Sequence, residues 1–227
     1  MSVNIVEKID DLVKVRNVLI SVSNKNGLDK FIPELIKLNP DIKILSTGGT
    51  FIKIQEILGN ASESYLTQVS DYTGQPETQG GLVKTLDFKI YLGLLTETYN
   101  DSHQQDIKRT DSVPIDMVVV NLYPFKETIM KKDVTLEEAR GNIDIGGPCM
   151  IRASAKNFIR VASVVDPEDY ETVVSALKAN SGKTTLELRY DLSKKAFEHT
   201  AGYDRAISNY IASGSFKETV LPCYNLK

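Results

Sequence analysis

The strongest constraint on the fold is a continuous apolar run from Met117 to Val120, which contains three successive valines and lies in a strand predicted over 117–122. β-Branched residues favour strands, and a strand that is apolar at every position is expected in the centre of a parallel sheet, where both faces are covered. Shorter apolar segments predict further strands at 17–22, 41–45, 65–69, 90–95 and 160–165. Since helical patterns separate these strands, the chain is predicted to form an α/β domain with a mostly parallel sheet.

Several segments between the predicted strands carry signals for helices. Thr135 and Glu138 match a capping box, and Pro148 would occupy the first turn of a helix after Gly147, where proline is tolerated. Other helices are predicted over 28–37, 51–58, 100–110, 168–179 and 184–212. An amphipathic helix is also expected within residues 1–15, either packed on the body or at an oligomer contact. The predicted organisation is an N-terminal extension (1–15), one domain (16–212) and a C-terminal tail (213–227).

Charge and apolar patterning exclude several classes of protein. The 27 basic and 30 acidic residues give a net charge of −3, which offers no reason to expect nucleic-acid binding. No apolar stretch is long enough to span a bilayer, and the N-terminus lacks the apolar core of a signal peptide. The two cysteines, Cys149 and Cys223, do not make a disulfide framework. We therefore expect a cytoplasmic protein without membrane or nucleic-acid partners.

A glycine turn after the second predicted strand has the composition of a phosphate site. In Thr47-Gly48-Gly49-Thr50 the glycines would let the backbone approach an anion, the threonines would add hydroxyl donors, and the next helix would present free N–H groups. The alternative is a simple turn, to which glycine is equally suited. Ser23 and Lys25 follow the preceding strand. Because ligands in open α/β sheets bind at the carboxyl ends of strands, an anionic ligand is predicted here.

Four polar residues stand in apolar or small-residue settings, where burial is costly without a partner. They are Lys84, Tyr123, Asp144 and Lys156. Each has a structural alternative: a snorkelling lysine, a core tyrosine with a satisfied hydroxyl, a helix-capping aspartate and a lysine at a helix C-terminus. Together they indicate a catalytic site that uses lysine, tyrosine and aspartate. Neither His103 nor His199 has metal-ligand spacing, so no metal is expected.

These segments resemble, in order, the inosine monophosphate (IMP) cyclohydrolase domain of the bifunctional purine-biosynthesis enzyme. The resemblance covers about residues 16–212. It rests on Ile20-Ser21-Val22-Ser23-Asn24-Lys25, Ser46-Thr47-Gly48-Gly49-Thr50, Thr73-Gly74-Gln75-Pro76-Glu77, Gly80-Gly81-Leu82-Val83-Lys84-Thr85-Leu86, Asn121-Leu122-Tyr123-Pro124-Phe125, Ile143-Asp144-Ile145-Gly146-Gly147, Ala155-Lys156-Asn157 and Ala196-Phe197-Glu198-His199-Thr200-Ala201. It implies a methylglyoxal-synthase-like fold, which is a three-layer α/β/α sandwich with a mostly parallel sheet.

The resemblance also implies a reaction and the residues that perform it. The reaction is closure of 5-formamidoimidazole-4-carboxamide ribonucleotide (FAICAR) to IMP with loss of water, and it needs no metal or organic cofactor. The implied catalytic residues are Lys84, Tyr123, Asp144 and Lys156. The implied substrate-binding residues are Ser23, Lys25, Thr47, Gly48, Gly49, Thr50 and Thr85 near the phosphate and ribose, and Asn121 and Gly146 near the base.

These residue types suit the chemistry. A lysine would stabilise negative charge on the formyl oxygen, and Asp144 would accept a proton from the amide nitrogen. Nearby lysines are expected to lower the pKa of Asp144, which would make it a better orienting group than a base.

Three departures from the family pattern favour an alternative function. Leu82 stands where the family usually has arginine, Asp87-Phe88 where it has His-Pro, and Phe158 where it has histidine. Loss of the arginine removes a charged ligand contact, and Asp87 adds negative charge where an anion is expected. The alternative is therefore a nucleotide- or phosphate-sensing module that kept the fold and lost activity. Methylglyoxal synthase proper is disfavoured, since the sequence shows no convincing aspartate–histidine pair.

The resemblance leaves the assembly open. The sequence contains no formyltransferase domain, so we expect either a stand-alone cyclohydrolase with a separate formyltransferase partner or a piece of a longer protein. A homodimer is expected because the family dimerises.

Overall fold

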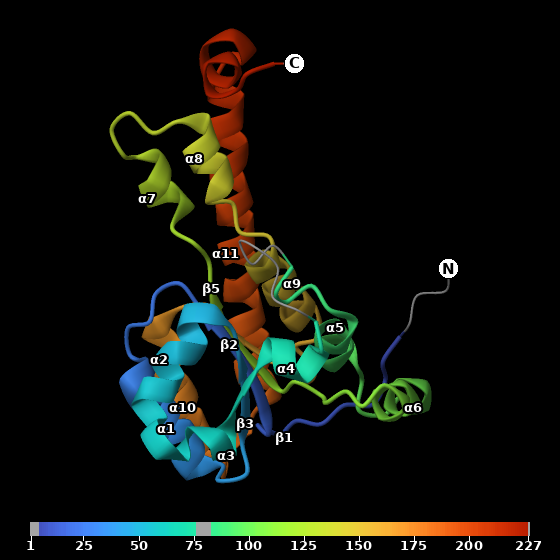
Figure 1. Ribbon diagram of the computed structural model, residues 1–227. Coiled ribbons are helices and arrows are strands. Elements are labelled where there is room, and N and C mark those ends of the chain that lie inside the picture. Colours follow the sequence, from blue (N-terminus) through green and yellow to red (C-terminus); the bar gives the residue numbers. More distant parts are fainter. Residues whose placement is uncertain (1–4, 76–82, 227) are drawn as a thin grey trace.

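A five-stranded parallel sheet forms the middle of the protein, whose computed structural model describes residues 5–75 and 83–226 (Figure 1). The strands stand in the order β4-β3-β2-β5-β6, and each neighbouring pair is parallel. They are β2 (Asn17–Val22), β3 (Lys43–Ser46), β4 (Leu66–Gln68), β5 (Met117–Asn121) and β6 (Ala162–Val164). The parallel sheet and the inner position of the valine-rich strand β5 are thus as predicted.

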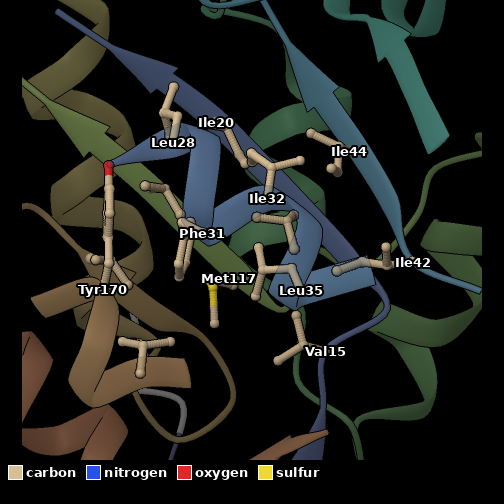
Figure 2. Close-up of a cluster of buried hydrophobic side chains, with 14 of the residues drawn as sticks. Val15, Ile20, Leu28, Phe31, Ile32, Leu35, Ile42, Ile44, Met117 and Tyr170 are labelled. Atoms are coloured by element: carbon tan, nitrogen blue, oxygen red, sulfur yellow. The ribbon is translucent and has the colours of Figure 1, made fainter. Parts of the chain in front are cut away.

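Side chains alternate along the central strands and build a core on each face of the sheet. On one face Ile20, Ile44 and Met117 pack with helix residues that include Phe31 and Tyr170 (Figure 2). The opposite face carries a second cluster, whose strand residues are Leu19, Leu45, Val118 and Val120. Neighbouring positions of one strand therefore serve different cores, which explains why apolar residues follow one another within the central strands.

Helices cover both cores and complete the three layers. The first core is covered by α1 (Leu28–Leu38), α2 (Gly48–Leu58) and α10 (Tyr170–Ala179). The second is covered by α5 (Phe88–Leu95), α9 (Gly146–Lys156) and α11 (Leu186–Ser213). This is the three-layer α/β/α sandwich that the resemblance implies.

Smaller elements connect the layers. They are β1 (Val13–Lys14), η1 (Gly59–Ala61), α3 (Ser62–Tyr65), α4 (Val69–Thr73), α6 (Asp101–Arg109), α7 (Phe125–Ile129), α8 (Leu136–Gly141), η3 (Pro167–Asp169), β7 (Lys183–Thr184), η4 (Phe216–Val220) and η5 (Leu221–Cys223). The capping box predicted at Thr135 and Glu138 begins α8. In Figure 1, α7, α8 and the C-terminal end of α11 project beyond the sheet and its covering helices.

The strand predicted at 90–95 is wrong, because this segment forms helix α5. The Asp87 carboxylate accepts a hydrogen bond from the Lys89 backbone N–H at 2.7 Å and caps the helix. The apolar residues pack against α9, and Ile90 and Leu94 are fully buried there. A short buried helix and a buried strand share this apolar composition, so periodicity alone could not distinguish them.

The N-terminal helix is also wrong in its described part, because residues 5–12 are not helical. Residues 1–4 lie outside the described residues. The next two residues form β1, which pairs antiparallel with β7. The buried guanidinium of Arg189 donates hydrogen bonds to the carbonyl oxygens of Asp10 and Asp11 at 2.8 and 3.0 Å. These carbonyls are therefore used in a tertiary contact and not in a helix.

The domain boundaries at 16 and 212 stay predictions. Among the described residues, no helix has both the length and the apolar character needed to cross a membrane.

Candidate active site

A cavity of about 340 Å³ opens at the carboxyl ends of β2, β3 and β5. β2 lies between β3 and β5 in the sheet, so the chain leaves β2 in one direction and returns to its other side. Such a reversal of strand order opens a crevice beyond the strand ends, where ligands of open α/β sheets bind. The loop before α9 and residues 83–86 close the remaining sides of the cavity.

Twelve of the thirteen site residues predicted from sequence line this cavity, and Lys156 is the exception. The twelve are Ser23, Lys25, Thr47, Gly48, Gly49, Thr50, Lys84, Thr85, Asn121, Tyr123, Asp144 and Gly146. Lys156 is exposed at the last position of α9, whose first residue, Gly146, borders the cavity. At a rise of about 1.5 Å per residue the two ends of this helix are roughly 15 Å apart. Lys156 is therefore not part of the cavity in one chain.

Two lysines and a helix N-terminus meet on one side of the cavity. A side chain at Gly48 would come within 3.2 Å of the Lys84 amine, and one at Gly49 would come within 3.8 Å of the Lys25 amine. α2 begins at Gly48, and the side chain of Thr47 makes no capping hydrogen bond to it. The first N–H groups of a helix have no partner within it and carry partial positive charge. This side of the cavity is therefore suited to an anion.

Glycine is required at position 48 for two reasons. Its backbone has a φ of +48°, which residues with a side chain rarely adopt, and a β-carbon would lie 3.2 Å from the Lys84 amine, which is closer than most β-carbon contacts. The Gly-Gly turn is therefore not only a chain reversal, since it brings the backbone close to a charged group.

Two predicted binding residues hold the walls of the cavity in place. The Thr50 hydroxyl donates to the Val22 carbonyl at 3.0 Å and accepts from the Val22 N–H at 3.0 Å, which ties α2 to β2. The Asn121 amide pairs with the backbone of Asn24 through both of its polar atoms, at 2.8 and 3.0 Å. These groups fix the loops after β2 and β3. The hydroxyl that the sequence assigned to Thr50 as a ligand donor is engaged in the fold.

Asp144 stands in the loop before α9. Its Oδ1 accepts a hydrogen bond from the Gly147 N–H at 2.9 Å, and its own N–H donates to the Tyr203 hydroxyl at 2.8 Å. Burial raises the pKa of the Asp144 carboxyl, although the N–H groups of Gly147 and Tyr123 act in the opposite direction. The expected lowering by nearby lysines is therefore wrong, because desolvation is the largest effect. A carboxylate with a raised pKa is a better proton acceptor.

Thr85 and Tyr123 complete the side around Asp144. A β-carbon at Gly146 would lie 2.6 Å from the Thr85 hydroxyl oxygen, so Thr85 packs directly against the start of α9. The Tyr123 side chain is 55% exposed and stands at the mouth of the cavity. The cavity thus has a cationic side at Gly48 and an acidic side at Asp144.

Two of the three departures from the family pattern have side chains that are engaged in the fold. Asp87 is buried and caps α5, and Phe158 packs against Tyr190 with ring centroids 5.3 Å apart. Neither residue lines the cavity. Leu82 lies outside the described residues.

Sequence reasoning missed contributions from Ile145, Gly147, Met150 and Tyr203. The first three line the cavity, and Tyr203 of α11 holds the loop of Asp144. The glycine pair at 146–147 was the available signal for the close approach of α9. Tyr203 gave no signal, because it is fifty-nine residues from Asp144 in the chain. Within the described ranges, no cluster of three or more His, Cys, Asp or Glu side chains could hold a metal ion.

Comparison with known proteins gives matches over most of the chain. The MGS-like domain model matches residues 27–149, and the model of the AICARFT/IMPCHase bienzyme matches residues 154–226. The bifunctional purine biosynthesis protein PurH of Thermoanaerobacter sp. (strain X514) is 50% identical over 196 residues, which are 86% of this chain and 37% of that protein. PurH of Lysinibacillus sphaericus (strain C3-41) is 47% identical over 212 residues, or 93% of this chain and 40% of that protein.

A solved structure is similar as well. The crystal structure of ForH superimposes with a TM-score of 0.70 at 27% identity, covering 85% of this chain and 97% of that chain. The chain spans 37% and 40% of the length of the two PurH proteins. The resemblance to the cyclohydrolase part of the bifunctional enzyme is thereby confirmed, and the chain belongs to the family of MGS-like domains.

Proposed function

We propose that this chain is an IMP cyclohydrolase, which closes FAICAR to IMP in the last step of purine synthesis. The observation that carries the proposal is the two-sided cavity, with Lys25, Lys84 and the α2 N-terminus on one side and Asp144 on the other. A ribonucleotide has a phosphate at one end and a reacting heterocycle at the other. The volume of about 340 Å³ falls in the range of small-molecule sites.

The reaction joins two groups of one molecule. The carboxamide nitrogen attacks the formyl carbon and forms the new C–N bond. The carboxamide and formamido nitrogens each give up one proton, and the formyl oxygen leaves with both as water. Because the reacting groups are already tethered, the protein has to fix their orientation and does not have to collect two reactants.

The charged residues of the cavity have separate roles in this proposal. The Gly48-Gly49 turn and Lys25 bind the phosphate. The Asp144 carboxylate, whose pKa burial raises, accepts the carboxamide proton. The Lys84 ammonium, which would turn from Gly48 toward the heterocycle when the substrate binds, stabilises the negative charge that develops on the formyl oxygen. Tyr123 at the mouth and Thr85 beside Gly146 orient the heterocycle.

Lys156 and the homodimer are linked in this proposal. Lys156 is exposed at the distal end of α9, so it could serve a cavity only if a second copy of the chain presented it. The formyl group of the substrate must come from a formyltransferase, which is the second proposed partner.

The decisive experiment mixes the protein with FAICAR and follows purine formation by absorbance. Turnover is expected, and Lys84→Ala should lower kcat by about 100- to 1,000-fold, the typical loss for one oxyanion donor. Lys53→Ala is the matched control, because Lys53 is a partly exposed lysine of α2 paired with Glu56. Binding of IMP without turnover would favour the sensing module, and an unchanged rate in Lys84→Ala would remove Lys84 from the mechanism.

A further inference from the structure

A hydrogen bond between Gln75 and Asp87 joins two residues that are twelve positions apart in the chain and flank the segment that carries Lys84. The Gln75 Nε2 donates to the Asp87 Oδ2 at 2.7 Å, while the other carboxylate oxygen accepts from the Lys89 N–H at 2.7 Å. Asp87 is only 4% exposed. Both oxygens of this buried carboxylate therefore accept a hydrogen bond, and one donor, Gln75, precedes Lys84 in the chain whereas Asp87 follows it.

Gln75 is itself held to the body of the protein. Its backbone N–H donates to the Thr73 hydroxyl, which donates to the Val69 carbonyl in α4. α4 is anchored in turn by Tyr72, whose hydroxyl accepts from the Val113 N–H at 2.9 Å and whose carbonyl accepts from the Lys89 amine at 3.3 Å. The hydrogen bond thus connects two fixed helices and not two loose ends.

Residues 83–86, which precede Asp87, line the active site and make close contacts there. A β-carbon at Gly48 would lie 3.2 Å from the Lys84 amine, and one at Gly146 would lie only 2.6 Å from the Thr85 hydroxyl oxygen, which leaves no room for it. Asp87 follows Thr85 by two residues. A shift of the chain at Asp87 would therefore move the Lys84 amine or the Thr85 hydroxyl within the cavity.

We propose that Asp87 and Gln75 are positioning residues, which hold Lys84 and Thr85 in the cavity by clasping the chain on both sides of them. This inference rests on the proposed function for its effect on rate. It gives a role to a residue that departs from the family pattern: the negative charge of Asp87 anchors the catalytic segment and does not face the substrate.

The first test is kinetic and uses Gln75→Ala, which removes the clasp and leaves the α5 cap. A misplacement of about 1 Å costs roughly 100-fold in rate, so kcat should fall by about 10- to 100-fold while KM changes less. In the Lys84→Ala background the same substitution should lower kcat by a smaller factor, because the part of the effect that acts through Lys84 is already lost and only the part through Thr85 remains. Gln75→Glu, which exchanges the donor for an acceptor at equal size, should match Gln75→Ala. Asn100→Ala is the control, since it removes the cap of α6 away from the cavity.

The second test does not depend on activity. Hydrogen exchange of a peptide covering residues 83–91 should be about 10-fold faster in Gln75→Ala than in the unmodified protein, while peptides of the sheet should not change. An unchanged kcat, or an effect fully additive with Lys84→Ala, would overturn the proposal. If the unmodified protein does not convert FAICAR, the proposed function fails, and the clasp is then decided by exchange alone: unchanged exchange refutes it.

Discussion

Gly147 gives the sharpest test of the acidic side of the cavity. A β-carbon at this position would lie 2.5 Å from Asp144 Oδ2 and 2.6 Å from a methyl carbon of Leu122. Ordinary contacts of a β-carbon begin at 3.4 Å, so the carboxylate would have to retreat by about 0.9 Å, or α9 would have to move away from β5. The backbone of Gly147 does not have a positive φ. The effect of Gly147→Ala is therefore steric and not conformational.

The expected loss has two components. Overpacking of this kind costs about 1–3 kcal/mol of stability, which thermal unfolding measures. Displacing the proton acceptor by nearly 1 Å should lower kcat by about 100-fold, which the FAICAR absorbance assay measures. The matched control is Gly202→Ala in α11, where no atom lies within 4 Å of the added carbon. The control should gain about 0.5–1 kcal/mol of stability from helix propensity and keep its activity.

A kcat within threefold of the unmodified protein in Gly147→Ala would refute the reasoning, provided that stability falls as expected. In that case the packing argument would hold, but the position of Asp144 would not matter for the reaction. If Gly147→Ala instead loses less than about 1 kcal/mol of stability, α9 moves away from the added carbon easily.

Three further outcomes are expected. Asp144→Asn should abolish turnover and raise the melting temperature at neutral pH. The pKa of Asp144 is higher in the folded than in the unfolded protein, so ionisation of this carboxyl destabilises the fold above the folded-state pKa. The gain in melting temperature should therefore vanish below the unfolded-state pKa of about 4. Arg160→Met should lower the free energy of unfolding by about 3–5 kcal/mol in denaturant titrations, because it leaves the buried carboxylate of Asp116 without its 2.9 Å ion-pair partner. If Lys156 acts in a neighbouring copy, Lys84→Ala and Lys156→Ala should each be strongly impaired alone and should recover part of the activity when mixed, and a mixture without recovery would contradict that role.

The sequence predicted the fold where local pattern and burial agree. β5 is apolar because both of its faces are covered, and Thr135 begins a helix because its capping box is complete within four residues. The prediction failed at 90–95, where packing against α9 turns an apolar run into a helix. It failed again at residues 5–12, because Arg189 engages the carbonyls of Asp10 and Asp11 from almost 180 positions away. No local pattern contains that information.

The sequence predicted correctly those cavity residues that directly follow the carboxyl ends of strands. The loops after β2, β3 and β5 reach the cavity because the carboxyl ends of parallel strands share one edge of the sheet. Lys156 could not be placed by the same rule, since it ends a helix that begins at the cavity. The helix expected after Gly147 already implied this separation, because ten residues of helix extend about 15 Å. A residue that matches a motif therefore reaches the site of its own chain only if the element that carries it does not extend away from that site.

The departures from the family pattern show why a substitution is evidence about a site only when its side chain faces that site. Asp87 supports the inactive sensing module only if its negative charge faces the anionic ligand. Its carboxylate instead caps α5 and accepts from Gln75, and Phe158 packs on Tyr190 away from the cavity. Asp87 and Phe158 therefore depart from the family pattern for structural reasons, a helix cap and a packing contact, and give no support to the sensing module. Twelve of the residues that line the cavity are those that the resemblance to the cyclohydrolase domain implies, and this agreement supports the proposed catalytic function over the sensing module.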